Sequence, residues 1–133
     1  MNIKLSKIAS LLSLDLIGTD TNIYNLSIDS REVKKGDFFV AIEGIKFDGH
    51  DYIQESISNG ACAIMCNDRF DVSKINVPYI VCHDTLKSLA DLAAGYRKII
   101  GSPLTIGITG TNGKTTVTQL TTAILKQCFS VST

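Results

Sequence analysis

The sequence has little proline, no excess of charge and no long apolar run. Of its 133 residues, two are proline, ten are glycine and 44% are hydrophobic. This is the balance of an ordinary globular chain rather than of a disordered or collagen-like one. Thirteen basic residues balance thirteen acidic ones, and no block of five like charges occurs. The sequence therefore disfavours non-specific binding to nucleic acid or to an anionic membrane surface.

Membrane segments, signal peptides and metal-binding cysteine motifs are also missing. No apolar run approaches the roughly 18 residues of a spanning helix. Residues 1–7 lack the continuous apolar core of a signal peptide, so we expect a cytoplasmic protein. The cysteines form no C-x-x-C pair, and His50 and His83 are not spaced as zinc partners. We expect buried, reduced thiols at the four cysteines, which are Cys62, Cys66, Cys82 and Cys128.

The apolar pattern of the first hundred residues predicts an α/β sheet. A chain of this length can support one core of its own, so we expect one domain and a fragment of another. Residues 3–14 are typical of a short amphipathic helix. Asp51, with Gln54 three residues later, predicts the N-cap of a second helix that ends at Asn59. The expected strands are residues 26–29, 37–42, 61–66 and 77–82, the last two being apolar runs typical of strands buried on both faces.

A long helix and a new structural unit follow. Asp84 predicts the N-cap of a helix that continues to Ile100, and the sequence Gly101-Ser-Pro103 stops it. Residues 104–109 then predict a strand, which leads through a glycine-rich turn into a further helix.

That turn has the composition of a phosphate-binding loop. Gly110 and Gly113 allow backbone conformations in which successive N–H groups point at one anion, and the following helix adds its positive dipole end. Lys114 would reach the β- and γ-phosphates of a nucleotide, and the Thr115 hydroxyl falls where such loops supply a ligand to Mg²⁺. The general pattern wants a glycine where this chain has Ile108. A glycine-rich connection without a ligand is the alternative.

Two blocks of sequence together resemble the Mur ligase family. The upstream block comprises Asp29-Ser-Arg31, Lys35-Gly-Asp-Phe-Phe-Val-Ala-Ile42, Asp48-Gly-His-Asp-Tyr-Ile53 and Gly60-Ala61, and it is similar to the amino-terminal domain of these ligases. Residues 107–116 resemble the family's ATP loop, including a glycine displaced by one position to Gly107. Within the family, the motif Thr-Asn-Gly-Lys, together with the upstream blocks, is most similar to that of the MurE type, the UDP-N-acetylmuramoyl-tripeptide synthetases. The MurF type, which adds D-Ala-D-Ala, stays open, and folylpolyglutamate synthetase shares only the ATP loop.

The resemblance implies an α/β fold with a mixed-sheet UDP-substrate domain at residues 1–100. Residues 101–133 would be the first strand, loop and helix of the central ATP-binding domain. The implied reaction is ATP-dependent amide-bond formation in peptidoglycan synthesis, with ATP and Mg²⁺ as cofactors. ATP phosphorylates the free D-Glu side-chain carboxylate of UDP-MurNAc-L-Ala-D-Glu, and the amine of L-lysine or meso-diaminopimelate attacks the acyl phosphate. We also expect a monomer that binds no nucleic acid and does not insert into a membrane.

The resemblance also assigns roles to individual residues. Lys114 is the catalytic residue, since it neutralises charge between the carboxylate and the γ-phosphate. Thr115 is the Mg²⁺ ligand. The expected ATP contacts are Thr109, Gly110, Thr111, Asn112, Gly113, Lys114, Thr115 and Thr116. The expected contacts of the UDP moiety are Ile28, Ser30, Arg31, Gly44, Ile45, Lys46, Phe47 and Asp48.

Simpler roles compete with some of these assignments. Asp29 and Arg31 could form only a local ion pair that closes a turn. Asp48 to His50 could serve only as turn chemistry. His83 is expected to be a surface residue at a helix entrance.

The resemblance covers only the first part of a Mur ligase. We therefore expect a truncated chain that is inactive alone and whose apolar residues Val117, Leu120 and Ile124 lack their normal cover. The alternatives are a UDP-sugar-binding module without catalysis and a degraded gene product without function.

Overall fold

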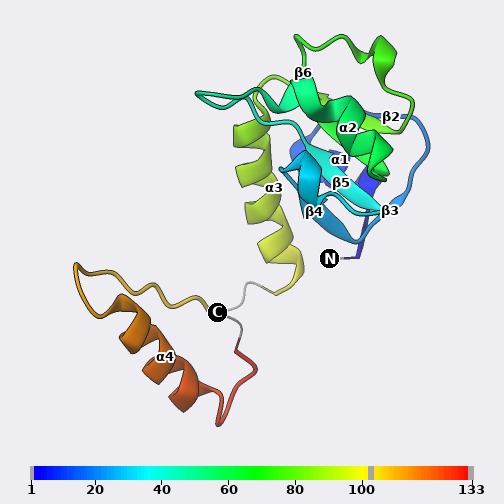
Figure 1. The fold of residues 1–133 in the computed structure, drawn as a ribbon. Helices are drawn as coiled ribbons and strands as arrows, with labels where there is room; N and C mark the ends of the chain where they lie inside the picture. The colour runs from blue at the N-terminus through cyan, green and yellow to red at the C-terminus, as the bar shows by residue number, and fades with distance from the viewer. Residues whose placement is uncertain (1, 102–103, 132–133) are drawn as a thin grey trace. The chain divides into compact units, whose positions relative to one another are not determined.

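The computed structural model describes residues 2–101 and 104–131 and divides the chain into two units after Gly101. Figure 1 shows both units, which are described separately below. Two residues of the predicted helix stop, Ser102 and Pro103, lie outside the described residues.

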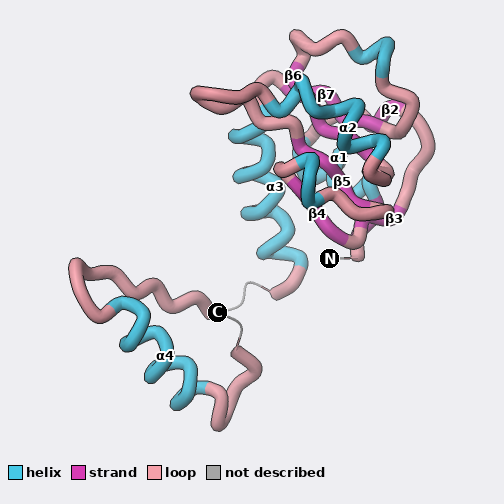
Figure 2. Tube along the Cα trace, in the orientation of Figure 1, coloured by secondary structure: helices cyan, strands magenta, loops and turns pink. Residues whose placement is uncertain are grey.

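A mixed five-stranded sheet forms the centre of the first unit (Figure 2). Its strand order is β2-β7-β6-β5-β4, in which β4 to β7 run parallel and the edge strand β2 is antiparallel to β7. A separate antiparallel pair joins β1 to β3. This arrangement confirms the mixed α/β fold. The strands are β1 Ile3–Lys4, β2 Leu16–Ile17, β3 Asn22–Ile23, β4 Asn25–Ser27, β5 Asp37–Val40, β6 Ala63–Asn67 and β7 Tyr79–Cys82.

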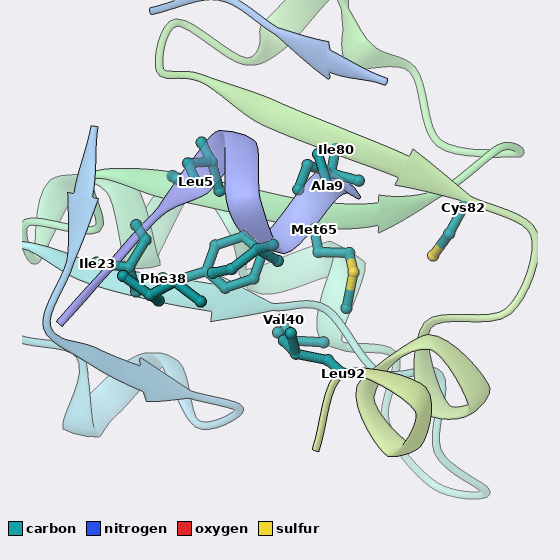
Figure 3. Close-up of a cluster of buried hydrophobic side chains, with 12 residues drawn as sticks. Leu5, Ala9, Ile23, Phe38, Val40, Met65, Ile80, Cys82 and Leu92 are labelled. Atoms are coloured by element: carbon teal, nitrogen blue, oxygen red, sulfur yellow. The ribbon is translucent and has the colours of Figure 1, made fainter. Parts of the chain in front are cut away.

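Helices cover both faces of this sheet. On one face, Phe38, Val40 and Met65 pack in a cluster with residues of α1 (Leu5–Leu12) and α3 (Thr85–Ile99), as Figure 3 shows. On the other face, Phe39 and Ile64 pack with residues of α2 (Ile53–Ser58). Because successive strand residues point to opposite faces, a strand between two helical layers must be apolar throughout. This explains the apolar residues 38–40 of β5 and 63–66 of β6.

The first helix is shorter than predicted. Ile3 and Lys4 pair with β3 instead, and α1 ends where Ser13 adopts a left-handed conformation with φ of 55°. Its first turn is satisfied from outside the helix, since the Ser6 N–H and hydroxyl both donate to the Asp20 carboxylate at 2.9 Å. Tertiary pairing therefore displaced the start of a helix that the periodicity placed at residue 3.

The predicted cap of the second helix was wrong. Asp48, not Asp51, begins the segment by accepting a hydrogen bond from the His50 N–H at 2.9 Å, and a 3-10 turn η2 (Gly49–Tyr52) follows. The helix α2 then starts at Ile53 without a side-chain cap and ends at Ser58, with Asn59, the predicted stop, as its C-cap. An aspartate bonded two residues ahead stabilises a tight turn first, which moves the α-helical start past Asp51.

The long helix α3 is confirmed with its cap, since the Asp84 carboxylate accepts from the Lys87 N–H at 2.8 Å. Two further 3-10 turns are η1 (Ser30–Glu32) and η3 (Val72–Lys74). None of the described helices is long and apolar enough to cross a membrane.

The second unit contains the predicted helix but not the predicted strand. The helix α4 spans Lys114–Leu125, whereas residues 104–109 form no strand. A strand needs a neighbour for its backbone hydrogen bonds, and the described part of this unit offers none. Leu104 is 90% exposed, and the expected lack of cover holds for Val117, Leu120 and Ile124, which are all exposed.

Candidate functional site

A cavity of about 590 Å³ opens in the first unit where the parallel strands β4 and β5 end. The carboxyl edge of parallel strands is where open α/β sheets usually bind ligands. Its walls come from β5, the turn η1, the loop after β5, the turn η2 and the helix α2. The lining residues are Ile28, Asp29, Ser30, Arg31, Phe39, Ile42, Phe47, Gly49, Tyr52 and Glu55.

One wall is the turn η1, which the Asp29 side chain closes. Its carboxylate accepts from the Arg31 N–H at 3.0 Å and forms an ion pair with the Arg31 guanidinium at 2.6 Å. The side-chain and backbone bonds from Arg31 lower the pKa of Asp29 to about 2, and the side-chain bond to Asp29 raises the pKa of Arg31. The local ion pair anticipated as a simpler role is therefore present. Both residues also line the cavity, so the pair shapes the wall while adding little stability in solvent.

Ser30 is the buried polar residue of this wall, with 6% of its surface exposed. Its hydroxyl donates to the Glu55 carboxylate at 3.1 Å, and its carbonyl accepts from the Asn59 side-chain amide at 2.9 Å. Glu55 and Asn59 lie one helical turn apart, so one stretch of chain holds Ser30 at two points. Sequence reasoning missed Glu55. No local signal could have identified it, because its partner Ser30 lies 25 positions away.

The opposite wall is a tight loop of residues 43–48. The Gly44 N–H donates to the Phe47 carbonyl at 2.9 Å, and Gly49 donates to the Ile42 carbonyl at 2.8 Å. Of the loop residues expected to contact UDP, Phe47 lines the cavity, whereas Lys46 and Asp48 do not. Gly44 and Ile45 line a separate cavity of about 750 Å³. The structure thus brings four predicted residues to one cavity, which are Ile28, Ser30, Arg31 and Phe47.

His50 anchors this loop to the sheet. The buried ring accepts from the Asn67 N–H at the end of β6 through Nε2, at 2.9 Å, and its Nδ1 lies 2.5 Å from the Asp48 carboxylate. Because Nε2 accepts, the neutral ring carries its proton on Nδ1 and donates it to Asp48. Burial raises the pKa of Asp48, but the bonds from His50 outweigh it and the net pKa is lowered. Turn chemistry is therefore one role of these residues.

The phosphate-loop candidate lies in the second unit. Gly113 is the N-cap of α4 with φ of 76°, a conformation that favours glycine. The described residues supply no side-chain cap here, although Asp20 and Asp84 cap α1 and α3. Lys114 begins the helix, where its charge opposes the helix dipole, and its ammonium donates to the Gly110 carbonyl. An uncapped N-terminus beside a lysine fits an anion such as phosphate.

Other predicted sites are simpler. The described residues hold no cluster of three histidine, cysteine or acidic side chains that could bind a metal ion. All four cysteines are free thiols. Burial raises the pKa of Cys66 to about 11 and also raises that of Cys62 and Cys82. Cys128 is exposed, so its predicted burial was wrong: it lies in the turn after α4, where no other described segment covers it. His83 is a surface residue, as predicted.

Comparison with known proteins decides the family. Residues 22–97, more than half of the chain, match the profile described as Mur ligase family, catalytic domain. The chain belongs to the Mur ligase family. It is 43% identical over 121 residues to the UDP-N-acetylmuramoyl-L-alanyl-D-glutamate–2,6-diaminopimelate ligase of Aquifex aeolicus, covering 88% of this chain and 24% of that protein. It is 32% identical over 128 residues to the UDP-N-acetylmuramoyl-tripeptide–D-alanyl-D-alanine ligase of Escherichia coli, covering 96% and 27%.

Solved Mur ligases share the fold. A crystal structure of MurF from Acinetobacter baumannii superposes with a TM-score of 0.84 over 96% of this chain and 28% of that one; at 24% identity, it supports the fold alone. MurF from Thermotoga maritima in complex with ADP is 34% identical, with a TM-score of 0.64 over 81% of this chain and 24% of that one. The chain spans about a quarter of the length of these relatives. Both ligase types are among them, so the match does not distinguish MurE from MurF.

Proposed function

We propose that this chain is the UDP-substrate domain and the beginning of the ATP-binding domain of an ATP-dependent peptidoglycan ligase. The cavity at the carboxyl edge of β4 and β5 carries the proposal, because it unites the Asp29-Ser-Arg31 turn with Phe47 of the glycine loop. Residues 1–100 would form the first domain and residues 101–133 the start of the second. The division of the structure after Gly101 is compatible with this boundary.

The cavity has the chemistry expected of a nucleotide site. Phe39 and Phe47 provide apolar walls suited to a planar base, and Ser30 and Glu55 provide polar atoms that can fix its orientation. The other predicted UDP contacts, Gly44, Ile45, Lys46 and Asp48, would act through the position of the loop that carries Phe47.

Residues 109–116 would bind the phosphates of ATP. The free N–H groups at the start of α4 would hold the phosphates, and Lys114 would balance their charge as an anionic carboxylate approaches. Mg²⁺, when bound, supplies further charge neutralisation, and the Thr115 hydroxyl would be one of its ligands.

For the ligase type we propose MurE, which adds L-lysine or meso-diaminopimelate to UDP-MurNAc-L-Ala-D-Glu in the cytoplasm. The Thr-Asn-Gly-Lys motif of the loop and the Aquifex aeolicus relative support this assignment. A MurF-type ligase is the second candidate, favoured by the Escherichia coli relative and the ADP complex from Thermotoga maritima. A UDP-sugar-binding module without catalysis is the third.

Calorimetry on the 133-residue chain tests the division of labour between the two loops. We expect UDP to bind, Ser30→Ala to weaken binding about tenfold, and Lys114→Ala to leave UDP affinity unchanged. Lys114→Ala is the matched control because it removes a charge from the other unit. Absence of measurable heat at about 1 mM UDP would overturn the proposed substrate site.

Phosphate release from ATP tests the ligase type. A protein of the relatives' full length that carries these residues is supplied with UDP-MurNAc-dipeptide and a diamino acid, or with UDP-MurNAc-tripeptide and D-Ala-D-Ala. Turnover with the first pair is expected, and turnover with the second pair alone would assign the MurF type. The 133-residue chain alone is expected to show no turnover.

A further inference from the structure

The hydroxyl proton of Ser30 is already committed within the protein. A serine hydroxyl has one proton and two lone pairs, whereas a carboxylate can only accept. The 3.1 Å bond from Ser30 Oγ to Glu55 Oε2 therefore uses the only proton of the Ser30 hydroxyl. The Asn59 amide also bonds to the Ser30 carbonyl and so holds the backbone that carries this side chain. Towards the cavity, Ser30 offers lone pairs alone.

Glu55, like the Ser30 oxygen, can only accept hydrogen bonds. It lines the cavity, and no described donor is bonded to its second oxygen, Oε1. Ser30, held by Glu55, thus presents hydrogen-bond acceptors to this end of the cavity. It would hold a ligand group that donates and would disfavour one that accepts.

The charges around Ser30 also favour an uncharged ligand group at this end of the cavity. The guanidinium of Arg31 is engaged by Asp29 through two bonds, at 2.9 Å from Nε and 2.6 Å from Nη2. Glu55 forms no ion pair among the described residues, although its charge also acts on Arg31 at longer range. The two carboxylates, Asp29 and Glu55, outnumber the one guanidinium among these lining residues, so this end of the cavity is negative. A diphosphate is disfavoured beside an unpaired carboxylate. The uncharged end of a nucleotide would therefore face Ser30 and Glu55.

We propose that Glu55 is a positioning residue that holds Ser30 as a hydrogen-bond acceptor and so selects a ligand by a donor group. The inference rests on the proposed UDP site. A uridine nucleotide carries two kinds of donor, the imide N–H of the ring and the hydroxyls of the ribose. CDP has an acceptor nitrogen in place of the imide N–H and an amino donor in place of the neighbouring O4 acceptor, and 2′-deoxy-UDP lacks one hydroxyl. These two ligands distinguish which donor is read.

The test is calorimetry of the chain with UDP, CDP and 2′-deoxy-UDP. The wild-type chain is expected to prefer UDP about tenfold over the ligand that lacks the recognised donor. Glu55→Ala frees the Ser30 proton and should shrink this preference to less than about threefold, whereas Glu55→Gln keeps an acceptor oxygen and should preserve it. The exposed Glu32 lies in the same 3-10 turn as Ser30 but does not line the cavity. The Glu32→Ala variant therefore controls for the loss of one negative charge.

A double-mutant cycle separates positioning from direct contact. If Glu55 acts through Ser30, then Glu55→Ala in a Ser30→Ala background should cost less than about twofold in UDP affinity. Additive losses would overturn the positioning role. Equal affinity of the wild-type chain for all three nucleotides would overturn the inference while leaving the UDP site standing. No binding of any of them would overturn the proposed function and this inference with it. Since Glu55 is exposed, its truncation leaves the core packing intact, and thermal melting of each variant checks this.

Discussion

Replacing Gly49 with alanine should destabilise the first unit through one steric conflict. An added Cβ would lie 2.6 Å from the Ile42 nitrogen and 2.8 Å from its oxygen, closer than Cβ atoms approach backbone atoms in real proteins. Both neighbours are backbone atoms of Ile42, just after β5 ends at Val40, so neither can yield by changing a rotamer. Overpacking of this kind costs about 1–3 kcal/mol. The 2.8 Å bond from Gly49 to Ile42 would also stretch, which costs about another 1 kcal/mol.

We therefore expect Gly49→Ala to lower the free energy of unfolding by about 2–4 kcal/mol. For a unit of this size, this corresponds to a fall in Tm on the order of 10–25 °C. Urea denaturation followed by circular dichroism measures the change, with Gly107→Ala as the control because nothing lies within 4 Å of a Cβ added there. UDP affinity should fall as well, since Gly49 lines the cavity. If the free energy of unfolding of Gly49→Ala lay within about 0.5 kcal/mol of the wild-type value, the close approach of Gly49 to the Ile42 backbone would be refuted.

Gly95→Ala should have the opposite sign: the substitution gains roughly 1 kcal/mol of helix propensity inside α3, and its Cβ would meet only the flexible end of Leu11 at 3.2 Å. The same denaturation assay checks it, and a loss of more than about 1 kcal/mol would mean that α1 and α3 pack too tightly to yield. Stability should also fall in acid, because the folded pKa of Asp29 is about 2 and that of Asp48 is lowered. Aspartate in the unfolded chain has a pKa of about 3.9. The stabilisation by the two ionised carboxylates is therefore complete above that pH and is lost as the pH falls towards about 2. Melting curves between about pH 5 and 2.5 test this, and Asp29→Asn should reduce the slope; an equal slope in that variant would contradict the assignment.

Elements encoded by local signals were predictable from the sequence. Asp84 and the spacing of apolar residues located α3, because a cap and a helical face depend on residues a few positions apart. Gly113 and Lys114 located the start of α4 for the same reason. The apolar run of β6 indicated burial on both faces. The Asp29-Ser-Arg31 and glycine-loop motifs identified two walls of the cavity, because their chemistry lies in consecutive residues.

Tertiary structure decided the features that join distant residues. His50 bonds to Asn67, 17 positions away, and Ser30 bonds to Glu55, 25 positions away, so neither contact leaves a local pattern. The same limit explains the strand predicted at residues 104–109, since composition indicates a strand but only a neighbouring strand can satisfy its backbone. Short-range hydrogen bonds and helical or strand periodicity depend on residues that are close in the sequence. Pairing, burial and the assembly of a cavity depend on which segments meet in space, and that is determined only when the whole unit packs.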